Sequence, residues 1–185
     1  PHPLPPGAAE AMVARAMGEK RDSDVWAMDG SAQGLAEVLG LVTLTPHGGG
    51  QSEVSYWVAP AFWNTGFASE AVNAVVVANP HGSRTLFAEV FQDNPASARV
   101  LTNAGFQYLG DAECFSVARA ATVPTWTYTR KMGLRDMSTN PVVIRTARLV
   151  LRPLEPGDAG WIAAGIADWD AMQWLTTPPW PYRIE

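Results

Sequence analysis

The chain has 185 residues, of which 47% are hydrophobic, and its formal net charge is −5. This length suits one domain with a hydrophobic core, and the hydrophobic fraction excludes an intrinsically disordered chain. The acidic balance argues against a general binder of nucleic acids or anionic membranes, and we expect neither as a partner. It suits a cationic or amine substrate, but an acidic surface also serves solubility alone.

One cysteine, Cys114, excludes a disulfide within the chain and favours a reducing compartment, so we expect a cytoplasmic protein. No run of 18 apolar residues is present, and we expect no membrane span. The start, Pro1–Pro6, lacks the basic-then-apolar order of a secretory signal. The three histidines are scattered without metal-ligand spacing, and we expect no metal.

The first 132 residues predict a helix, three strands, a helix, a strand, a helix and two strands, from helical or alternating apolar patterns and from turn residues between them. We expect these elements at Ala8–Lys20, Asp24–Met28, Leu35–Leu44, Glu53–Val58, Ser69–Ala78, Arg84–Phe91, Pro95 to Gly105, Phe106–Ala118 and Thr125–Lys131. This order predicts an α/β architecture, a mixed sheet with helices on both faces.

The pattern changes after residue 132. Residues 133–141 are polar and predict a linker. Residues 142–185 predict a strand at Val142–Pro153, a helix capped by Asp158 that runs to about Ala167, and a short helix at Trp169–Leu175. We therefore divide the chain into a body, 1–132, a linker and a final segment.

Two segments point to a nucleotide-type cofactor. A Pro turn at Pro60 and a short glycine loop precede a helix, which leaves backbone N–H groups free at the helix start, where a phosphate can bind. Gly66 allows a positive φ and a close backbone approach in this loop. Downstream, Asn94 caps a second helix that has Pro95 at its first position. Together they predict binding of a pyrophosphate.

Three motifs resemble the GNAT superfamily of acyl-CoA N-acyltransferases, in particular the branch that includes ribosomal-protein N-terminal acetyltransferases. Trp63–Ala68, followed by Ser69-Glu70-Ala71, stands where that family has its Gln/Arg-x-x-Gly-x-Gly/Ala loop, although Trp63 and Asn64 depart from the pattern. Asp93–Leu101 with Gly105-Phe106 is similar to the second motif, and Thr146–Leu154 to the first strand. The resemblance implies a GNAT-like fold with a mostly antiparallel, twisted central sheet.

The strand that normally opens this family comes last here. Three interpretations stay open: a circular permutation, an exchange in which residues 142–185 complete a neighbouring molecule and so form a homodimer, or a piece of a tandem gene. The linker reaches about 30 Å when extended, and a sheet edge five strands away lies about 24 Å off. Pairing within the chain and pairing between chains are both possible at these distances.

The resemblance implies acetyl-CoA as co-substrate. Its pantetheine arm would lie between the splayed strands Glu53–Val58 and Arg84–Phe91, with the N–H of Val58 polarising the thioester carbonyl. The implied cofactor-binding residues are Trp57, Val58, Trp63, Asn64, Thr65, Gly66, Phe67, Ala68, Ser69 and Asn94.

The resemblance also implies direct acetyl transfer to a primary amine, either a protein N-terminus or a small amine. Many members stabilise the departing thiolate with a Tyr, but Leu101 stands at that position, so we expect Ser97 to serve instead. Glu53 is the expected general base, with Glu89 as runner-up, although either can be a plain solvated strand charge. Tryptophans at positions 161, 169, 174 and 180 would give an aromatic acceptor pocket or simply pack in the core. The alternative function is a non-catalytic CoA-binding or interaction module.

Overall fold

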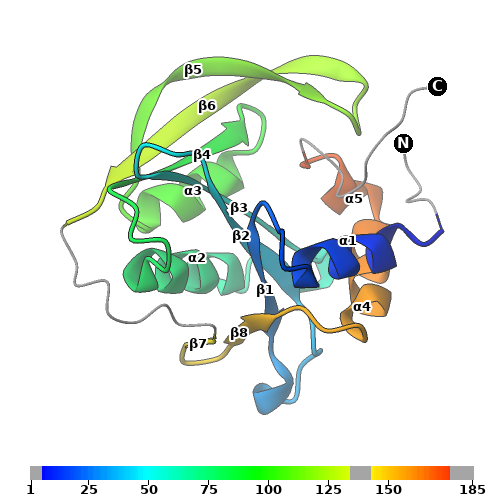
Figure 1. Cartoon of the computed structure of the whole chain (residues 1–185). Helices are drawn as coiled ribbons and strands as arrows, with labels where there is room; N and C mark the ends of the chain where they lie inside the picture. Colours follow the sequence, from blue (N-terminus) through cyan, green and yellow to red (C-terminus); the bar gives the residue numbers. More distant parts are fainter. Residues whose placement is uncertain (1–5, 134–142, 176–185) are drawn as a thin grey trace.

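The computed structural model describes residues 6–133 and 143–175, and it forms one eight-stranded sheet in the order β5-β6-β4-β3-β2-β1-β8-β7 (Figure 1). The strands are β1 Asp24–Asp29, β2 Gly40–Pro46, β3 Gln51–Val58, β4 Thr85–Phe91, β5 Gln107–Ser116, β6 Ala121–Lys131, β7 Ile144–Arg145 and β8 Val150–Pro153. The helices are α1 Ala8–Met17, α2 Phe67–Ala78, α3 Pro95–Asn103, α4 Asp158–Ile166 and α5 Trp169–Met172. Most strand pairs are antiparallel. The expected α/β mixed sheet is confirmed.

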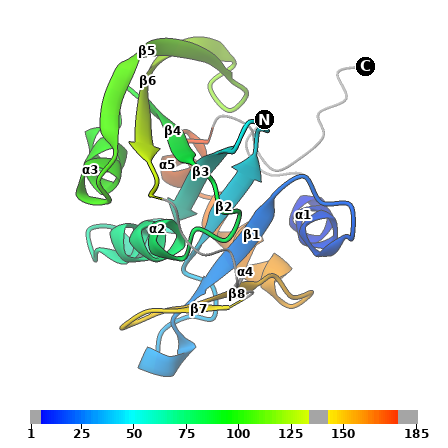
Figure 2. The ribbon, with the colours of Figure 1, turned by 60° about the vertical axis from the view of Figure 1, so that its left-hand side comes forward.

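Helices cover both faces of the sheet, and two apolar clusters result. On one face, α2 and α3 pack on β2, β3 and β4 through residues such as Val72, Val75 and Leu101, all fully buried. On the other face, α1 and α4 pack on β1 and β2 through residues such as Val13 and Ile162. Figure 2 shows α2 and α1 on opposite sides of the central strands. Helices therefore cover the central strands from both sides.

Strands β3 and β4 part in this way. They pair in parallel from Gln51 opposite Thr85 to Glu53 opposite Phe87, and within the described residues the pairing ends there. Both strands continue beyond this point, β3 to Val58 and β4 to Phe91. The splay expected from the family resemblance is therefore present, and it exposes strand backbone in the middle of the sheet.

The pairing of β3 with β2 fixes which backbone groups face the splay. The N–H of His47 donates to Gln51 O, and the N–H of Ala59 donates to Leu39 O. Backbone groups alternate sides along a strand, so the odd-numbered residues of β3 bond to β2 and the even-numbered residues face β4. The N–H groups of Tyr56 and Val58 therefore point into the gap between β3 and β4.

The final segment lies at the other edge of the central strands. Strand β8 pairs antiparallel with β1 of the same chain, from Trp26 opposite Pro153 to Asp29 opposite Val150. Arg152 fastens this pairing: its Nε donates to Asp29 at 2.9 Å, and its other two nitrogens donate to the buried carboxylate of Asp158 at 2.9 and 2.8 Å. Exchange of residues 142–185 between copies stays a prediction. The linker expected at residues 133–141 also stays a prediction, because most of it lies outside the described residues.

Several expected boundaries were wrong. The single strand expected at Val142–Pro153 is interrupted, because residues 146–149 form a tight turn in which the N–H of Thr146 donates to Leu149 O. The strand expected at Leu35–Leu44 begins only at Gly40, because the chain first loops back so that the N–H of Gly30 donates to Ala36 O.

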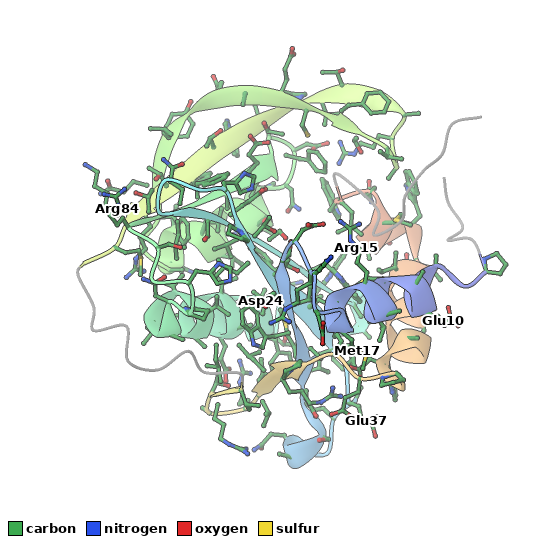
Figure 3. The ribbon with its side chains drawn as sticks, viewed as in Figure 1. Glu10, Arg15, Met17, Asp24, Glu37 and Arg84 are labelled. Atoms are coloured by element: carbon green, nitrogen blue, oxygen red, sulfur yellow. The ribbon has the colours of Figure 1, made fainter. Side chains whose placement is uncertain are left out.

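The remaining corrections concern helices. The first helix ends at Met17 (labelled in Figure 3) rather than Lys20, and α2 begins two residues before the expected Ser69. Asp158 is the first residue of α4 rather than its cap, since its carboxylate is engaged by Arg152. Helix α5 ends at Met172 rather than Leu175. Among the described residues, no helix combines the length and the apolar character that crossing a bilayer requires.

Candidate functional site

The loop before α2 leaves uncapped N–H groups at the helix start. After a short 3-10 turn at Pro60–Phe62, Asn64 and Gly66 adopt left-handed backbone, with φ of 59° and 85°. No side chain caps α2, and the first hydrogen bond of the helix runs from Glu70 N to Gly66 O. The amides of residues 67–69 therefore lack helical acceptors, which is the arrangement that binds phosphate.

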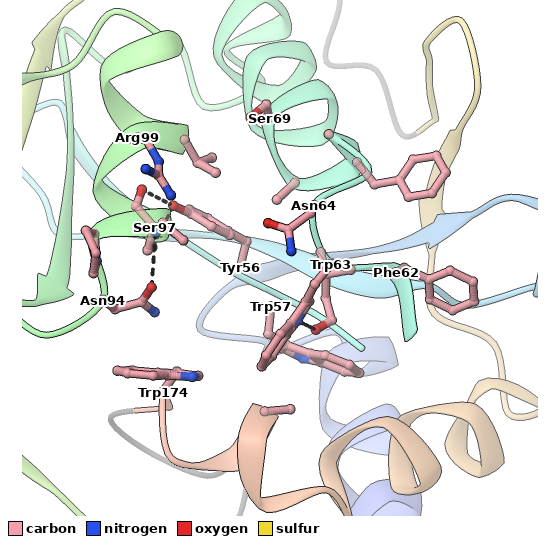
Figure 4. Close-up of a pocket in the computed structure, with 18 of the residues that line it drawn as sticks. Tyr56, Trp57, Phe62, Trp63, Asn64, Ser69, Asn94, Ser97, Arg99 and Trp174 are labelled. Atoms are coloured by element: carbon pink, nitrogen blue, oxygen red, sulfur yellow. Dashed lines mark hydrogen bonds between the residues drawn. The ribbon is translucent and has the colours of Figure 1, made fainter. Parts of the chain in front are cut away.

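Trp63 closes the end of β3 against this loop. Its indole Nε1 donates to the carbonyl of Val58 at 2.7 Å, the short dashed line beside Trp63 in Figure 4. Since the carbonyl of Val58 is engaged, its N–H is the group at this position that stays available to a ligand. Thr65 stabilises the loop itself, because its hydroxyl donates a hydrogen bond to Phe62 O at 2.5 Å.

Helix α3 places the hydroxyl of Ser97 at the splay between β3 and β4. Asn94 caps the helix as expected, with its Oδ1 accepting from the N–H of Ser97 at 3.2 Å. The Ser97 hydroxyl lies 2.8 Å from the hydroxyl of Tyr56, which also donates to Ser97 O at 3.0 Å. Burial raises the pKa of Tyr56 far above its usual value, so it stays protonated. Tyr56 therefore fixes the position of Ser97 (Figure 4).

A cavity of about 600 Å³ opens on the α2 and α3 side of the splay (Figure 4). Its volume lies within the range of pockets that hold small molecules and cofactors. Most of the predicted cofactor residues and one predicted catalytic residue line it: Trp57, Val58, Trp63, Asn64, Gly66, Phe67, Ala68, Ser69, Asn94 and Ser97. Thr65 is not among the lining residues.

A second cavity of about 420 Å³ opens on the α1 side of the sheet. Glu53 and Glu89 line it, from β3 and β4, together with Met12 of α1 and apolar residues of the strands. The two cavities meet at the splay, where they share Tyr56, Trp57, Asn94, Ser97, Trp174 and Leu175. The site therefore consists of two adjoining cavities that are lined by different kinds of residue.

The second cavity is acidic. Glu53 and Glu89 lie on neighbouring strands, and burial together with the charge of Glu53 raises the pKa of Glu89. Glu53 is held by His47, whose Nε2 lies 3.0 Å from its Oε2. The pair suits a cationic group or a transferable proton. No group of three or more His, Cys, Asp or Glu side chains that could hold a metal is found in residues 6–133 and 143–175.

Sequence reasoning missed Tyr56, although alternation along β3 places it on the same face as the predicted Val58. It also missed Arg99, which brings a cation to the first cavity. Of the predicted aromatic residues, Trp174 lines both cavities, whereas Trp161 and Trp169 are 45% and 42% exposed. Trp180 lies outside the described residues.

A sheet opened between two parallel strands beside an uncapped helix start is the arrangement that the resemblance to GNAT acyltransferases implies. A family model described as an acetyltransferase (GNAT) domain matches residues 1–107, more than half of the chain. The chain therefore belongs to the GNAT acetyltransferase family. The matched part contains the loop before α2, all of α3 and the splay between β3 and β4.

Individual relatives are distant or partial. The curated protein YoaA of Bacillus subtilis (strain 168), called an uncharacterized N-acetyltransferase, is 40% identical over 62 residues, which make up 32% of this chain. The match spans 35% of that relative, about a third of its length. A chimera of spermidine N-acetyltransferase SpeG from Vibrio cholerae and hSSAT shares the fold, with a TM-score of 0.55, 13% identity and coverage of 69% of this chain and 92% of its own.

The ribosomal-protein-S5-alanine acetyltransferase from Vibrio fischeri is also similar, with 20% identity and a TM-score of 0.47 over 51% of this chain and 55% of its own. The particular branch of the family and the permuted order of the chain stay predictions.

Proposed function

We propose that this protein is an acetyl-CoA-dependent N-acetyltransferase that transfers the acetyl group directly to a primary amine. The observation that carries the proposal is the pair of cavities on opposite faces of the sheet that meet at Tyr56 and Ser97. One cavity has free helix amides for a pyrophosphate, and the other has carboxylates for an amine. A direct transfer requires the two substrates to approach one carbon atom from different sides, and two cavities that adjoin at the splay allow this.

The coenzyme occupies the first cavity in this proposal. Its pyrophosphate lies on the amides of residues 66–69 and its pantetheine arm runs along β3 as an added strand. The N–H of Val58 faces the splay and donates to the thioester oxygen, which becomes negative when the amine attacks. Asn64 and Trp63 flank the loop, as the family resemblance implies.

The amine enters through the acidic cavity. Glu89 attracts the protonated amine, which gives one proton to solvent and becomes a neutral nucleophile. Glu53 then takes the second proton, which the nitrogen loses as it attacks the thioester carbon. The C–N bond forms, the C–S bond breaks, and the sulfur leaves with the electron pair of that bond. The Ser97 hydroxyl turns from Tyr56 to donate a hydrogen bond to the departing sulfur, which gains its proton from solvent. The products are an amide and coenzyme A.

The acceptor class follows from the second cavity. Its volume and its walls, which include Phe91, Phe115 and Trp174 beside the two carboxylates, suit a primary amine next to an apolar or aromatic group. A small amine of this kind and the N-terminal residue of a peptide both meet this description.

The test is release of free coenzyme A from acetyl-CoA with a panel of small amines and short peptides. Glu53→Gln should lower kcat about 100-fold with little change in the KM for acetyl-CoA, because a positioned base contributes about that factor. Glu89→Gln should raise the KM for the amine and leave kcat nearly unchanged. Binding of acetyl-CoA without release of coenzyme A for any acceptor would instead support the non-catalytic module.

A further inference from the structure

We propose that Arg148, from the turn between β7 and β8, is a ligand of the coenzyme's pyrophosphate, so that the final segment of the chain completes the cofactor site. This inference rests on the proposed function and deepens it. It assigns a cation to the phosphate loop, which has none within its own sequence, Trp63 to Ser69.

The turn is attached directly to the start of α2. Glu70, in the first turn of that helix, accepts from the hydroxyl of Thr146 at 2.5 Å, from the N–H of Arg148 at 2.9 Å and from its Nε at 2.7 Å. Burial alone would raise the pKa of Glu70, but the hydrogen bonds from Thr146 and Arg148 outweigh it and lower the pKa. The carboxylate is therefore ionised at neutral pH and anchors the turn.

The Arg148 side chain extends from this anchor across the loop. One terminal nitrogen donates to Thr65 O at 3.0 Å, and the guanidinium carbon lies 4.4 Å from the centre of the Phe67 ring. The other terminal nitrogen lies 3.4 Å from where a side chain on Gly66 would begin. This nitrogen therefore stands beside the loop whose amides would hold the phosphate, where it can donate to a phosphate oxygen bound there.

The guanidinium is also oriented to donate to an anion. Two of its nitrogens are engaged with Glu70 and Thr65, which fixes the plane of the group, and no hydrogen bond of its second terminal nitrogen is found within the described residues. The side chain is about 42% exposed. An arginine that is oriented by one carboxylate and still presents a donor to solvent is suited to bind an anion.

The experiment compares two acyl donors in Arg148→Ala. Acetyl-CoA carries the pyrophosphate, and S-acetylpantetheine carries the same thioester without it. Loss of one charge-assisted hydrogen bond should weaken acetyl-CoA binding, measured by calorimetry, about 10- to 100-fold, while kcat/KM for S-acetylpantetheine stays within about twofold of the unmodified protein. Arg145→Ala, an exposed neighbour on β7 with the same charge change, is the matched control and should alter neither donor.

Equal losses with both donors in Arg148→Ala would show that the residue only supports the fold, and no loss with either would remove it from the site. Arg148→Lys distinguishes these outcomes further. Lysine keeps the positive charge but lacks the planar N–H donors of the guanidinium, so this variant should recover part of the affinity for acetyl-CoA. If the unmodified protein does not bind acetyl-CoA, the proposed function itself fails, and this outcome is distinct from an Arg148→Ala variant that binds normally.

Discussion

The backbone N–H of Val58 is the proposed donor to the thioester oxygen, and it can be removed alone. Replacing Val58 by its α-hydroxy acid analogue turns the preceding amide into an ester, which deletes the N–H and keeps the side chain and the backbone shape. The pairing of β3 with β2 should survive, because its hydrogen bonds run through odd-numbered residues such as Ala59. Removal of one oxyanion donor costs about 100- to 1000-fold in kcat.

The assay is coenzyme A release at saturating acetyl-CoA and amine, with the urea midpoint measured for each variant. The matched control is the same ester substitution at Ala59, whose N–H donates to Leu39 O at 2.9 Å. The control should lose about 1 kcal/mol of unfolding free energy and keep kcat within a few-fold. If the ester at Val58 keeps kcat within about threefold, the N–H of Val58 is not the oxyanion donor and the reasoning from strand register is refuted.

Two further predictions concern the final segment. Asp158→Ala should lower the free energy of unfolding by about 3 kcal/mol in urea titrations, because it removes a buried carboxylate and leaves the partly buried Arg152 with Asp29 as its remaining close partner; a loss below about 1 kcal/mol would contradict this. The pKa of Glu70 in the folded protein is below its ordinary value of 4.5. The Glu70 carboxylate therefore stabilises the folded state above pH 4.5, and this contribution to the free energy of unfolding is lost as the pH falls through the lower, folded-state pKa. Thermal unfolding between pH 6 and pH 3 should show a smaller acid-induced loss in Glu70→Gln than in the unmodified protein, and equal losses would refute the role of this carboxylate.

Locally encoded features were predictable from the sequence. Helix α3 begins with Asn94 as its N-cap, which accepts from the N–H of Ser97, and with Pro95 at the first helical position. Both features were expected from the sequence. The turn at Gly66 depends on a backbone conformation that glycine favours, which also marks it in the sequence. The family resemblance added the splay between β3 and β4, which no local pattern encodes.

Long-range features were not predictable. Tyr56 and Ser97 are 41 residues apart and meet only because β3 and α3 converge at the splay. The break at residues 146–149 was missed because alternation of apolar residues continues through it, while the hydroxyl of Thr146 closes the turn by accepting from Leu149 N. The partners of Glu70, Thr146 and Arg148, lie more than 70 residues away in the sequence. Such contacts depend on tertiary structure that a single sequence does not display.

The central claim is that the loop amides before α2 hold a coenzyme's pyrophosphate. Titration of the ¹⁵N-labelled protein with coenzyme A, followed by amide chemical shifts, tests it most directly. We predict saturable shifts that are largest at residues 66–69, with a second group at Val58. Absence of binding at millimolar coenzyme A, or shifts concentrated away from this loop, would contradict the account.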